Sequence, residues 1–439
     1  MICSTTAEGL RYVVMKEGKR AAYCALSINC GTRVENVLKT SSKGGRYPSG
    51  TAHFVEHALF KGTARHSAQE INGYLERLGG ELNAYTTKEE IVLHSTVLSE
   101  DLRKAADLLF ELATEPLFPD GEVQKEKTVI LEEIASYKDS PADDIYDRFE
   151  SMLFEGHPLC GTILGTAASV KGLEAENLRE YVREFFVPSR MAVALVSPLE
   201  ESQMALMVEE LSREYFRSGE QTLKPGIVNS DLAEGKANPG AEPVFASLPA
   251  TSALPNLFDK TINRHTHQAN CILGSTAPSL YREQERIAAS LMANILGGPA
   301  SNSILNSLLR EKNGWVYNVE CNYTQYADTG MMAVSFGCDR ERLDDCMSAI
   351  YGELERLRDC PMDEDALAAA KKQLKGQLAI ASDNGESQAL SMGKSLLVFG
   401  RVYDDETICR QIDAVTPQDI QASARAIFAP DRLSKLVYL

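Results

Sequence analysis

Basic clusters, paired cysteines and long apolar runs are all scarce in this 439-residue sequence. No run of five or more Lys or Arg occurs, and 45 Lys+Arg against 62 Asp+Glu give a formal net charge of -17. Binding to nucleic acid phosphates or anionic lipid without sequence specificity needs a positive charge that this chain lacks. The charge balance therefore predicts no nucleic acid partner and favours neutral or cationic ones.

Signals for export or membrane insertion are also missing. The longest strongly apolar runs, such as Met191 to Val196, have about a third of the roughly 20 residues that a membrane-spanning helix needs. Residues 1–9 lack the basic and apolar regions of a signal peptide. The ten cysteines form no CxxC pair, which is typical of reduced thiols, although spacing leaves an oxidising location or a thiolate site open. We expect no membrane association and a cytoplasmic location.

Two long stretches of the chain resemble each other at one gapless offset of 242 residues. The matched pairs include Leu173 and Val415, Phe186 and Phe428, Pro188 and Pro430, and Pro119 and Pro361. Two unrelated amphipathic helices could match by chance. A single offset that aligns strand, helix and proline positions favours two related halves instead.

The halves are separated by residues 217–258, which are dense in proline and glycine and therefore predict a linker. We predict an N-terminal domain over 1–216 and a homologous C-terminal domain over 259–439. Each half is expected to begin with strands, followed by a helix, another strand and several amphipathic helices. The expected strands are Leu10 to Val14, Ala21 to Asn29, Glu90 to Leu98, Thr261 to Gly274 and Gly330 to Cys338. This order predicts an α+β fold in which each domain is a largely antiparallel sheet with helices packed on it.

The strongest chemical signal is a His-x-x-Glu-His pattern formed by His53, Glu56 and His57. Gly50 and Gly62 bound the segment, as expected for a short helix. On a helix, the three side chains point the same way. Two imidazoles four residues apart suit a tetrahedral zinc, and the carboxylate between them can act on a water without binding the metal. The alternative is two hydrogen-bonded core histidines beside an ion-paired glutamate.

A third ligand would have to come from elsewhere, and an acidic segment from Asp120 to about Tyr137 is the candidate. Asp120 can cap the start of a helix there. Glu126 and Glu133 are seven residues apart and nearly eclipsed on such a helix, whereas Glu132 points about 100° away. Spacing alone allows either a pair that faces the histidines or a solvated acidic stripe.

These residues carry a family resemblance. The segment from His53 to Thr63, followed 76 residues after His57 by Glu133, is similar to the pitrilysin/insulinase family of zinc peptidases, the inverzincins. That family includes the mitochondrial processing peptidase, whose two-domain subunits this chain resembles. The similarity covers nearly the whole chain apart from the linker, through segments 79–87, 156–166, 295–298 and 309–317.

The resemblance implies roles for individual residues. His53, His57 and Glu133 would bind one Zn2+ per chain, because the second half has no His-x-x-Glu-His pattern. Glu56 would be the general base toward a zinc-activated water, and Glu126 would orient a ligating imidazole. The expected enzyme is a zinc endopeptidase.

The resemblance also implies substrate contacts. Arg310 and Tyr317 match a pair that contacts substrate and helps to stabilise the oxyanion. An alternative is a surface arginine paired with Glu311 or Glu320 beside a core tyrosine. Asn83 and Ala84 resemble the start of an edge strand that pairs with extended substrate, although an ordinary internal strand is also possible.

By resemblance, the substrate is a peptide or unfolded protein held in extended form inside a closed chamber. Two-domain relatives work as pairs of chains, and this chain carries both the zinc motif and the Arg-Tyr pair. A homodimer with two composite sites is therefore expected, and a heterodimer with a paralogous chain is the alternative. The competing function is a non-catalytic subunit, or one that is active only beside such a partner.

Overall fold

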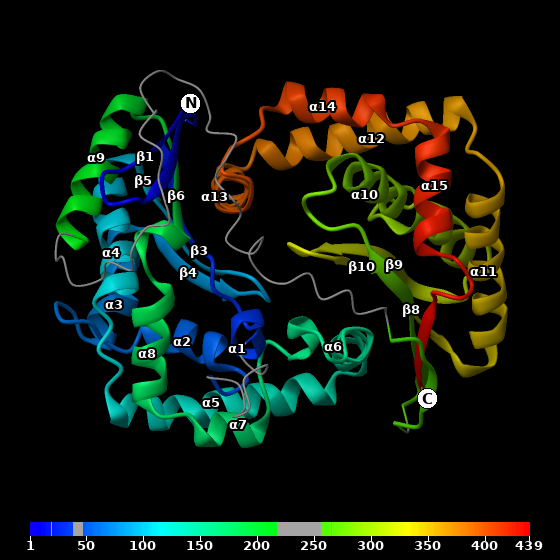
Figure 1. Cartoon of the computed structure of the whole chain (residues 1–439), viewed down its shortest axis with the longest axis horizontal. Coiled ribbons are helices and arrows are strands. Elements are labelled where there is room, and N and C mark those ends of the chain that lie inside the picture. Colours follow the sequence, from blue (N-terminus) through cyan, green and yellow to red (C-terminus); the bar gives the residue numbers. More distant parts are fainter. Residues whose placement is uncertain (19, 38–46, 217–255, 265) are drawn as a thin grey trace. The chain divides into compact units, whose positions relative to one another are not determined.

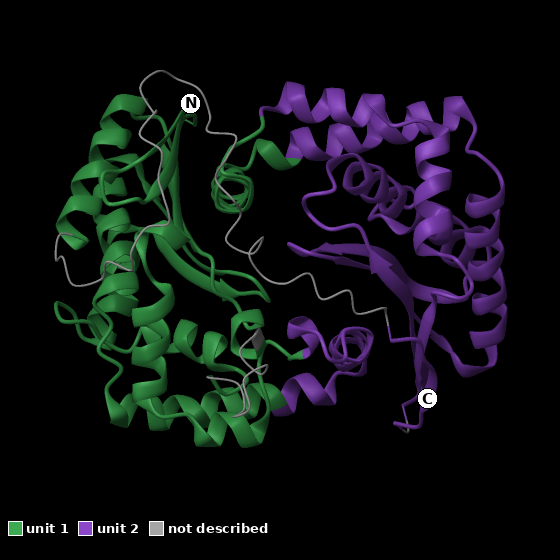
Figure 2. Ribbon diagram, viewed as in Figure 1, with its two compact units in different colours: residues 1–134, 161–247, 381–403 green, residues 135–160, 248–380, 404–439 purple. Residues whose placement is uncertain are grey.

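The computed structural model describes residues 1–18, 20–37, 47–216, 256–264 and 266–439. The chain divides into two compact units (Figure 2). Unit 1 takes in residues 1–134, 161–247 and 381–403, and unit 2 takes in residues 135–160, 248–380 and 404–439. Most of the predicted linker, residues 217–255, lies outside the described residues.

Unit 1 is built on a six-stranded sheet with the order β1-β2-β6-β3-β5-β4. Its strands are β1 (Ile2–Thr5), β2 (Arg11–Lys16), β3 (Ala21–Ile28), β4 (Glu81–Thr86), β5 (Ile91–Leu98) and β6 (Met191–Ser197). Among these strands only β2 and β6 pair in parallel, so the sheet is largely antiparallel, as predicted. Strand β4 lies at one edge of the sheet.

Helices cover both faces of the central strand β6, which is buried along its whole length (Figure 1). Because successive strand residues face opposite sides, Ala192, Ala194 and Val196 point to one face, where they contact helix α13 (Gly385–Phe399). The other α-helices described in unit 1 are α1 (Arg33–Val37), α2 (Thr51–Leu59), α3 (Ala68–Tyr74), α4 (Leu102–Thr114), α5 (Asp120–Asp139, which runs on into unit 2), α7 (Ala167–Gly172), α8 (Ala175–Phe185) and α9 (Glu201–Tyr215).

Unit 2 contains a five-stranded sheet with the order β7-β11-β8-β10-β9. Its strands are β7 (Asp259–Ile262), β8 (Gln268–Ala277), β9 (Val316–Gln325), β10 (Gly330–Asp339) and β11 (Ser434–Tyr438). The prediction of one strand from Thr261 to Gly274 is wrong. Strands β7 and β8 lie on opposite sides of β11, so the chain must leave the sheet between them.

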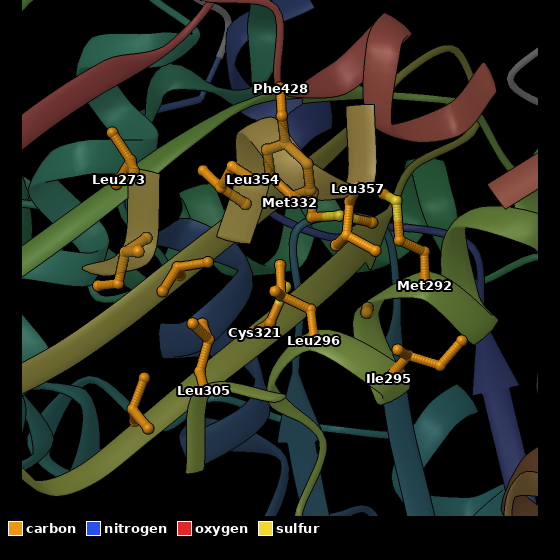
Figure 3. Packing of buried hydrophobic residues seen from close by; sticks show 14 of the residues in the cluster. Leu273, Met292, Ile295, Leu296, Leu305, Cys321, Met332, Leu354, Leu357 and Phe428 are labelled. Atoms are coloured by element: carbon orange, nitrogen blue, oxygen red, sulfur yellow. The ribbon is translucent and has the colours of Figure 1, made fainter. Parts of the chain in front are cut away.

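The core of unit 2 fills the space between this sheet and its helices (Figure 3). Leu296, Met332, Leu354 and Phe428 are buried there and come from four separate segments. The α-helices described in this unit are α6 (Pro141–Leu153), α10 (Glu283–Gly297), α11 (Leu343–Asp359), α12 (Glu364–Ser382), α14 (Asp405–Ala414) and α15 (Pro417–Ile427), and residues Asn306–Lys312 form a π-helix. None of the helices in the described ranges is long and apolar enough to cross a membrane.

Two helices related by the 242-residue offset are exchanged between the halves of the sequence. Helix α6 comes from the first half but packs on β8, β10 and β11 of unit 2. Helix α13 comes from the second half but packs on β2, β3 and β6 of unit 1. Each exchanged helix buries a stripe of apolar residues on its sheet, which in α6 is Ile145, Phe149 and Leu153. The predicted halves are continuous in sequence, whereas each compact unit combines segments from both.

Candidate metal centre

The His-x-x-Glu-His segment forms helix α2, as predicted. Phe54, Val55, Ala58 and Leu59 are buried and hold one side of the helix against unit 1. Its last residue is Leu59, so the helix ends three residues before the predicted stop at Gly62. Since the apolar side is fixed, the two histidines and the glutamate between them are presented together on the other side.

Helix α5 brings both predicted glutamates to the histidines, so they are not a solvated stripe. Glu133 Oε2 lies 3.7 Å from His53 Nε2 and 3.6 Å from His57 Nε2. Glu126 Oε1 lies 2.8 Å from His57 Nδ1, on the opposite side of that ring. Glu132 is exposed, as its position on the helix predicts. Glu133 therefore lies near Nε2 of His57, whereas Glu126 lies near Nδ1 of the same ring.

The donor set fits a zinc ion. One atom each from His53, His57 and Glu133 can be chosen so that all three lie within 4.8 Å of one another. Ligands about 2.1 Å from a tetrahedral zinc lie about 3.4 Å apart, close to the measured separations of the two imidazoles from the carboxylate. Two nitrogens and one oxygen are ligands that zinc prefers, and three protein ligands leave one position open. Among the described residues no other such group of histidine, cysteine and acidic side chains occurs.

Glu126 is itself held by a residue that the sequence interpretation missed, Lys61. Lys61 Nζ lies 2.7 Å from Glu126 Oε2, while His57 Nδ1–H donates to the other carboxylate oxygen. Burial opposes ionisation, but these two hydrogen bonds lower the pKa of Glu126 overall. The ionised carboxylate fixes the proton on Nδ1 of His57 and leaves Nε2 free to bind metal. The sequence feature that could have identified Lys61 is its position four residues after His57, which is about one helical turn.

Glu126→Gln should weaken zinc binding by about 10–100-fold, the usual cost of losing a carboxylate that supports a ligating histidine. The amide neither attracts the imidazole proton as strongly nor pairs with Lys61. Competition with a chelator of known affinity measures the change. Glu122→Gln, one turn earlier on α5 and paired with Lys125 rather than with a histidine, is the matched control. Equal zinc affinity in the two variants would contradict the supporting role of Glu126.

Glu56 is half-buried, and burial raises its pKa. A hydrogen bond from Thr86 offsets part of this effect, because Thr86 Oγ1 donates to Glu56 Oε2 at 2.6 Å. A carboxylate with a raised pKa accepts a proton more readily than an exposed one. Thr86 ends strand β4, and sequence interpretation missed its role although it lies two residues after Ala84 in the same motif.

The two imidazoles have opposite pKa shifts. Burial, reinforced by the charge of His57, lowers the pKa of His53 to about 3. Burial would also lower the pKa of His57, but the hydrogen bond to Glu126 and the charges of Glu56, Glu126 and Glu133 raise it overall. His53 is thus neutral at physiological pH and ready to bind a metal.

The metal-free protein should lose stability through His53 as the pH falls below 6.5. The unfolded chain takes up a proton at His53 near pH 6.5, whereas the folded chain does so only near pH 3. Because the unfolded state binds one more proton than the folded state, the free energy of unfolding falls by up to about 1.4 kcal/mol per pH unit. The total decrease between pH 6.5 and pH 5 is about 1–2 kcal/mol. Urea unfolding of chelator-treated protein at these pH values measures the change. His53→Gln should lack this part of the pH dependence, and an unchanged slope in that variant would contradict the assignment.

Asn83 and Ala84 lie on β4, paired with His94 and Leu93 of β5. The sheet order places β4 at the edge of unit 1, so the strand is not internal. Its last residue, Thr86, contacts Glu56, which puts one end of this edge beside the candidate metal centre. The backbone of an edge strand is available to an added strand.

Arg310 and Tyr317 belong to unit 2, whereas the metal-centre residues belong to unit 1. Arg310 Nε pairs with Glu311 Oε1 at 3.1 Å, and its side chain is 46% exposed. Tyr317 is 91% exposed and is therefore not a core residue. Arg310 also lines a cavity of about 590 Å³ together with residues of α10 and β9.

The site consists of two histidines and a glutamate on α2 and a further carboxylate from the later helix α5. A His-x-x-Glu-His helix of this kind on an α+β fold defines a class, the inverzincin type of zinc peptidase. The similarity of this sequence to known protein families agrees with this class. Residues 12–167 match the family described as "Insulinase (Peptidase family M16)" and residues 172–374 match "Peptidase M16 inactive domain". The chain belongs to the insulinase family, peptidase family M16.

Similar proteins are found in several bacteria. An uncharacterized zinc protease of Streptomyces coelicolor is 30% identical over 86% of this chain and 78% of its own length. The uncharacterized zinc protease YmxG of Bacillus subtilis is 28% identical over 89% of this chain and 88% of its own length. Two crystal structures share the fold: a protease from Helicobacter pylori (TM-score 0.83, 18% identity, 100% of this chain and 98% of that chain) and a peptidase M16 inactive domain from Pseudomonas fluorescens (0.82, 19%, 100% and 97%).

Proposed function

We propose that this protein is a zinc-dependent endopeptidase that hydrolyses peptides bound in extended form. The observation that carries the proposal is the meeting of His53, His57 and Glu133 around one point, with Glu56 on the same face of α2. Relatives named zinc proteases support it.

Each residue has a chemical task in this proposal. When bound by the three ligands, zinc would polarise a water molecule and the carbonyl of a peptide bond. Glu56 accepts the proton of the attacking water and delivers it to the leaving amine, a transfer that its raised pKa supports. Thr86 holds the Glu56 carboxylate in place during both transfers. Glu126 keeps His57 in the tautomer that binds metal through Nε2.

The substrate contacts are also proposals. The edge position of β4 supports main-chain pairing of an extended peptide with Asn83 and Ala84. The exposure of Arg310 and Tyr317 supports their use as donors toward a carbonyl oxygen of the substrate. The absence of a His-x-x-Glu-His pattern in the second half agrees with one Zn2+ per chain.

A second candidate is a subunit that is non-catalytic, or active only beside a paralogous chain. It is favoured by the name "Peptidase M16 inactive domain", which applies both to the family that residues 172–374 match and to one crystal structure of the same fold. Digestion of a peptide library by the purified chain, with and without a chelator and read by mass spectrometry, separates the two. Cleavage that the chelator abolishes supports the endopeptidase; no cleavage by a zinc-loaded single chain supports the subunit.

We also propose that the enzyme is a homodimer in which the Arg310 and Tyr317 pair of one chain serves the zinc of the other. A His53→Ala chain mixed with an Arg310→Ala chain should then recover about a quarter of wild-type activity. Half of the randomly mixed dimers contain both chains, and each of these has one intact site. Peptide hydrolysis after co-refolding measures the recovery. Verified mixed dimers without activity would instead indicate sites built within one chain.

A further inference from the structure

The N-terminus of the metal helix α2 has no cap of its own. The residue at the cap position is Gly50, which has a left-handed φ of 89° and no side chain. A larger residue is excluded there, because a Cβ on Gly50 would lie 2.7 Å from the carbonyl oxygen of Leu164. The first amides of a helix nevertheless need acceptors, especially in a buried position.

A glutamate from another element supplies these acceptors. Glu35 Oε2 accepts from Gly50 N at 2.9 Å, and Glu35 Oε1 accepts from Ala52 N at 2.7 Å. Glu35 is 1% exposed, so both bonds lie in the interior of unit 1. The buried carboxylate also places negative charge at the positive end of the helix dipole. Ala52 directly precedes His53, so the capped turn is the one that carries the first histidine.

Glu35 itself is fixed by the segment that follows β4. Gly31 packs so closely against Lys88 that a Cβ would lie 2.3 Å from the Lys88 carbonyl. Arg33 N donates to Lys88 O at 2.8 Å, which holds the start of α1. Two residues before Lys88, Thr86 donates to Glu56. One short segment therefore supports α2 at two places, through Thr86 at Glu56 and through α1 and Glu35 at the N-terminus.

We propose that Glu35 is a positioning residue of the metal centre. Its carboxylate sets the rotation and the height of α2, so that His53 and His57 present Nε2 to the same point as Glu133. The inference rests on the proposed function, because it assigns Glu35 a task only if this centre binds zinc. Sequence reasoning could not identify Glu35, since no local pattern links it to residues 15 and 17 positions later.

Glu35→Gln should bind zinc about 2–30-fold more weakly than wild type, the range that corresponds to the loss of a helix N-cap. The amide has the same shape, but it loses the charge and turns a donor toward one of the two backbone amides. Chelator competition measures the affinity, and thermal unfolding with and without zinc measures the stabilisation by the metal. A positioning role predicts a smaller zinc-induced rise in Tm and a lower kcat at unchanged KM. Glu35→Asp, which keeps the charge, should recover part of the affinity.

Glu90→Gln is the matched control, because Glu90 is 4% exposed in the same unit and pairs with Lys394 rather than with α2. It should keep wild-type zinc affinity. Wild-type affinity and zinc-induced Tm shift in Glu35→Gln would overturn the inference. Failure of both Glu35 variants to fold beside a folded control would also overturn it, by assigning Glu35 to the fold of the whole unit. If the wild-type protein binds no zinc, the proposed function fails instead.

Discussion

Glu56→Gln is expected to bind zinc as tightly as the wild-type protein and to hydrolyse peptides about 10²–10⁴-fold more slowly, the usual contribution of a general base. Glu56 lies on the same face of α2 as the two histidines, but it does not belong to the group of three possible ligands. Its neighbour is Thr86, whose hydroxyl donates to it. A glutamine fits the same space and keeps a hydrogen bond with Thr86, but it has no basic oxygen to take a proton.

The measurement is kcat and KM on a peptide that the wild-type protein cleaves, together with the zinc content of both proteins. Because the change affects proton transfer, kcat should fall while zinc content stays at one per chain. Glu132→Gln, an exposed carboxylate on α5, controls for the loss of one charge and should have wild-type activity. Near-normal turnover by Glu56→Gln would refute its assignment as base.

Glu133→Gln should lose both zinc and activity. The glutamate is the only negatively charged member of the proposed ligand set, and its Oε2 lies 3.7 Å from His53 Nε2 and 3.6 Å from His57 Nε2. An amide oxygen has no negative charge to offset the two charges of zinc. We therefore expect a decrease in zinc affinity greater than the about 10–100-fold typical of a supporting carboxylate. Peptide hydrolysis should fall to the level of chelator-treated wild-type protein.

The neighbouring Glu132→Gln is again the control, since it makes the same substitution one residue earlier on the same helix but outside the site. Its zinc affinity, measured by chelator competition, should match that of wild type. Adding zinc back to chelator-treated wild-type protein should restore hydrolysis, which shows that the chelator acts by removing the metal. A Glu133→Gln protein that keeps stoichiometric zinc after dialysis against chelator would refute the ligand assignment.

Much of the fold was predictable because strands and helices are encoded locally. The three strand ranges predicted in the first half and the long acidic helix agree with β2, β3, β5 and α5 to within a few residues. The exception, the supposed strand from Thr261 to Gly274, fails for a nonlocal reason. Its two ends pair with opposite sides of β11, which is formed by the last residues of the chain.

The exchanged helices α6 and α13 also show that local sequence patterns do not predict contacts between distant segments. The 242-residue offset relates α6 to α13 and predicts two related halves, and the structure contains two compact units. It does not indicate that each helix packs on the sheet of the other half. The apolar stripe of Ile145, Phe149 and Leu153 can pack on any apolar sheet face, and both sheets have such a face. Which sheet a helix covers depends on packing between distant segments.

The sequence by itself determined the chemistry offered by α2, because helical periodicity alone places His53, Glu56 and His57 on one face. It left open whether Glu126 and Glu133 face them. Only the tertiary structure decided that, by bringing α5 against α2 with Glu133 near both Nε2 atoms and Glu126 at Nδ1 of His57. It also revealed the supporting residues Lys61, Thr86 and Glu35. Periodicity is a property of neighbouring residues, whereas these contacts join segments whose approach is set by the packing of the whole unit.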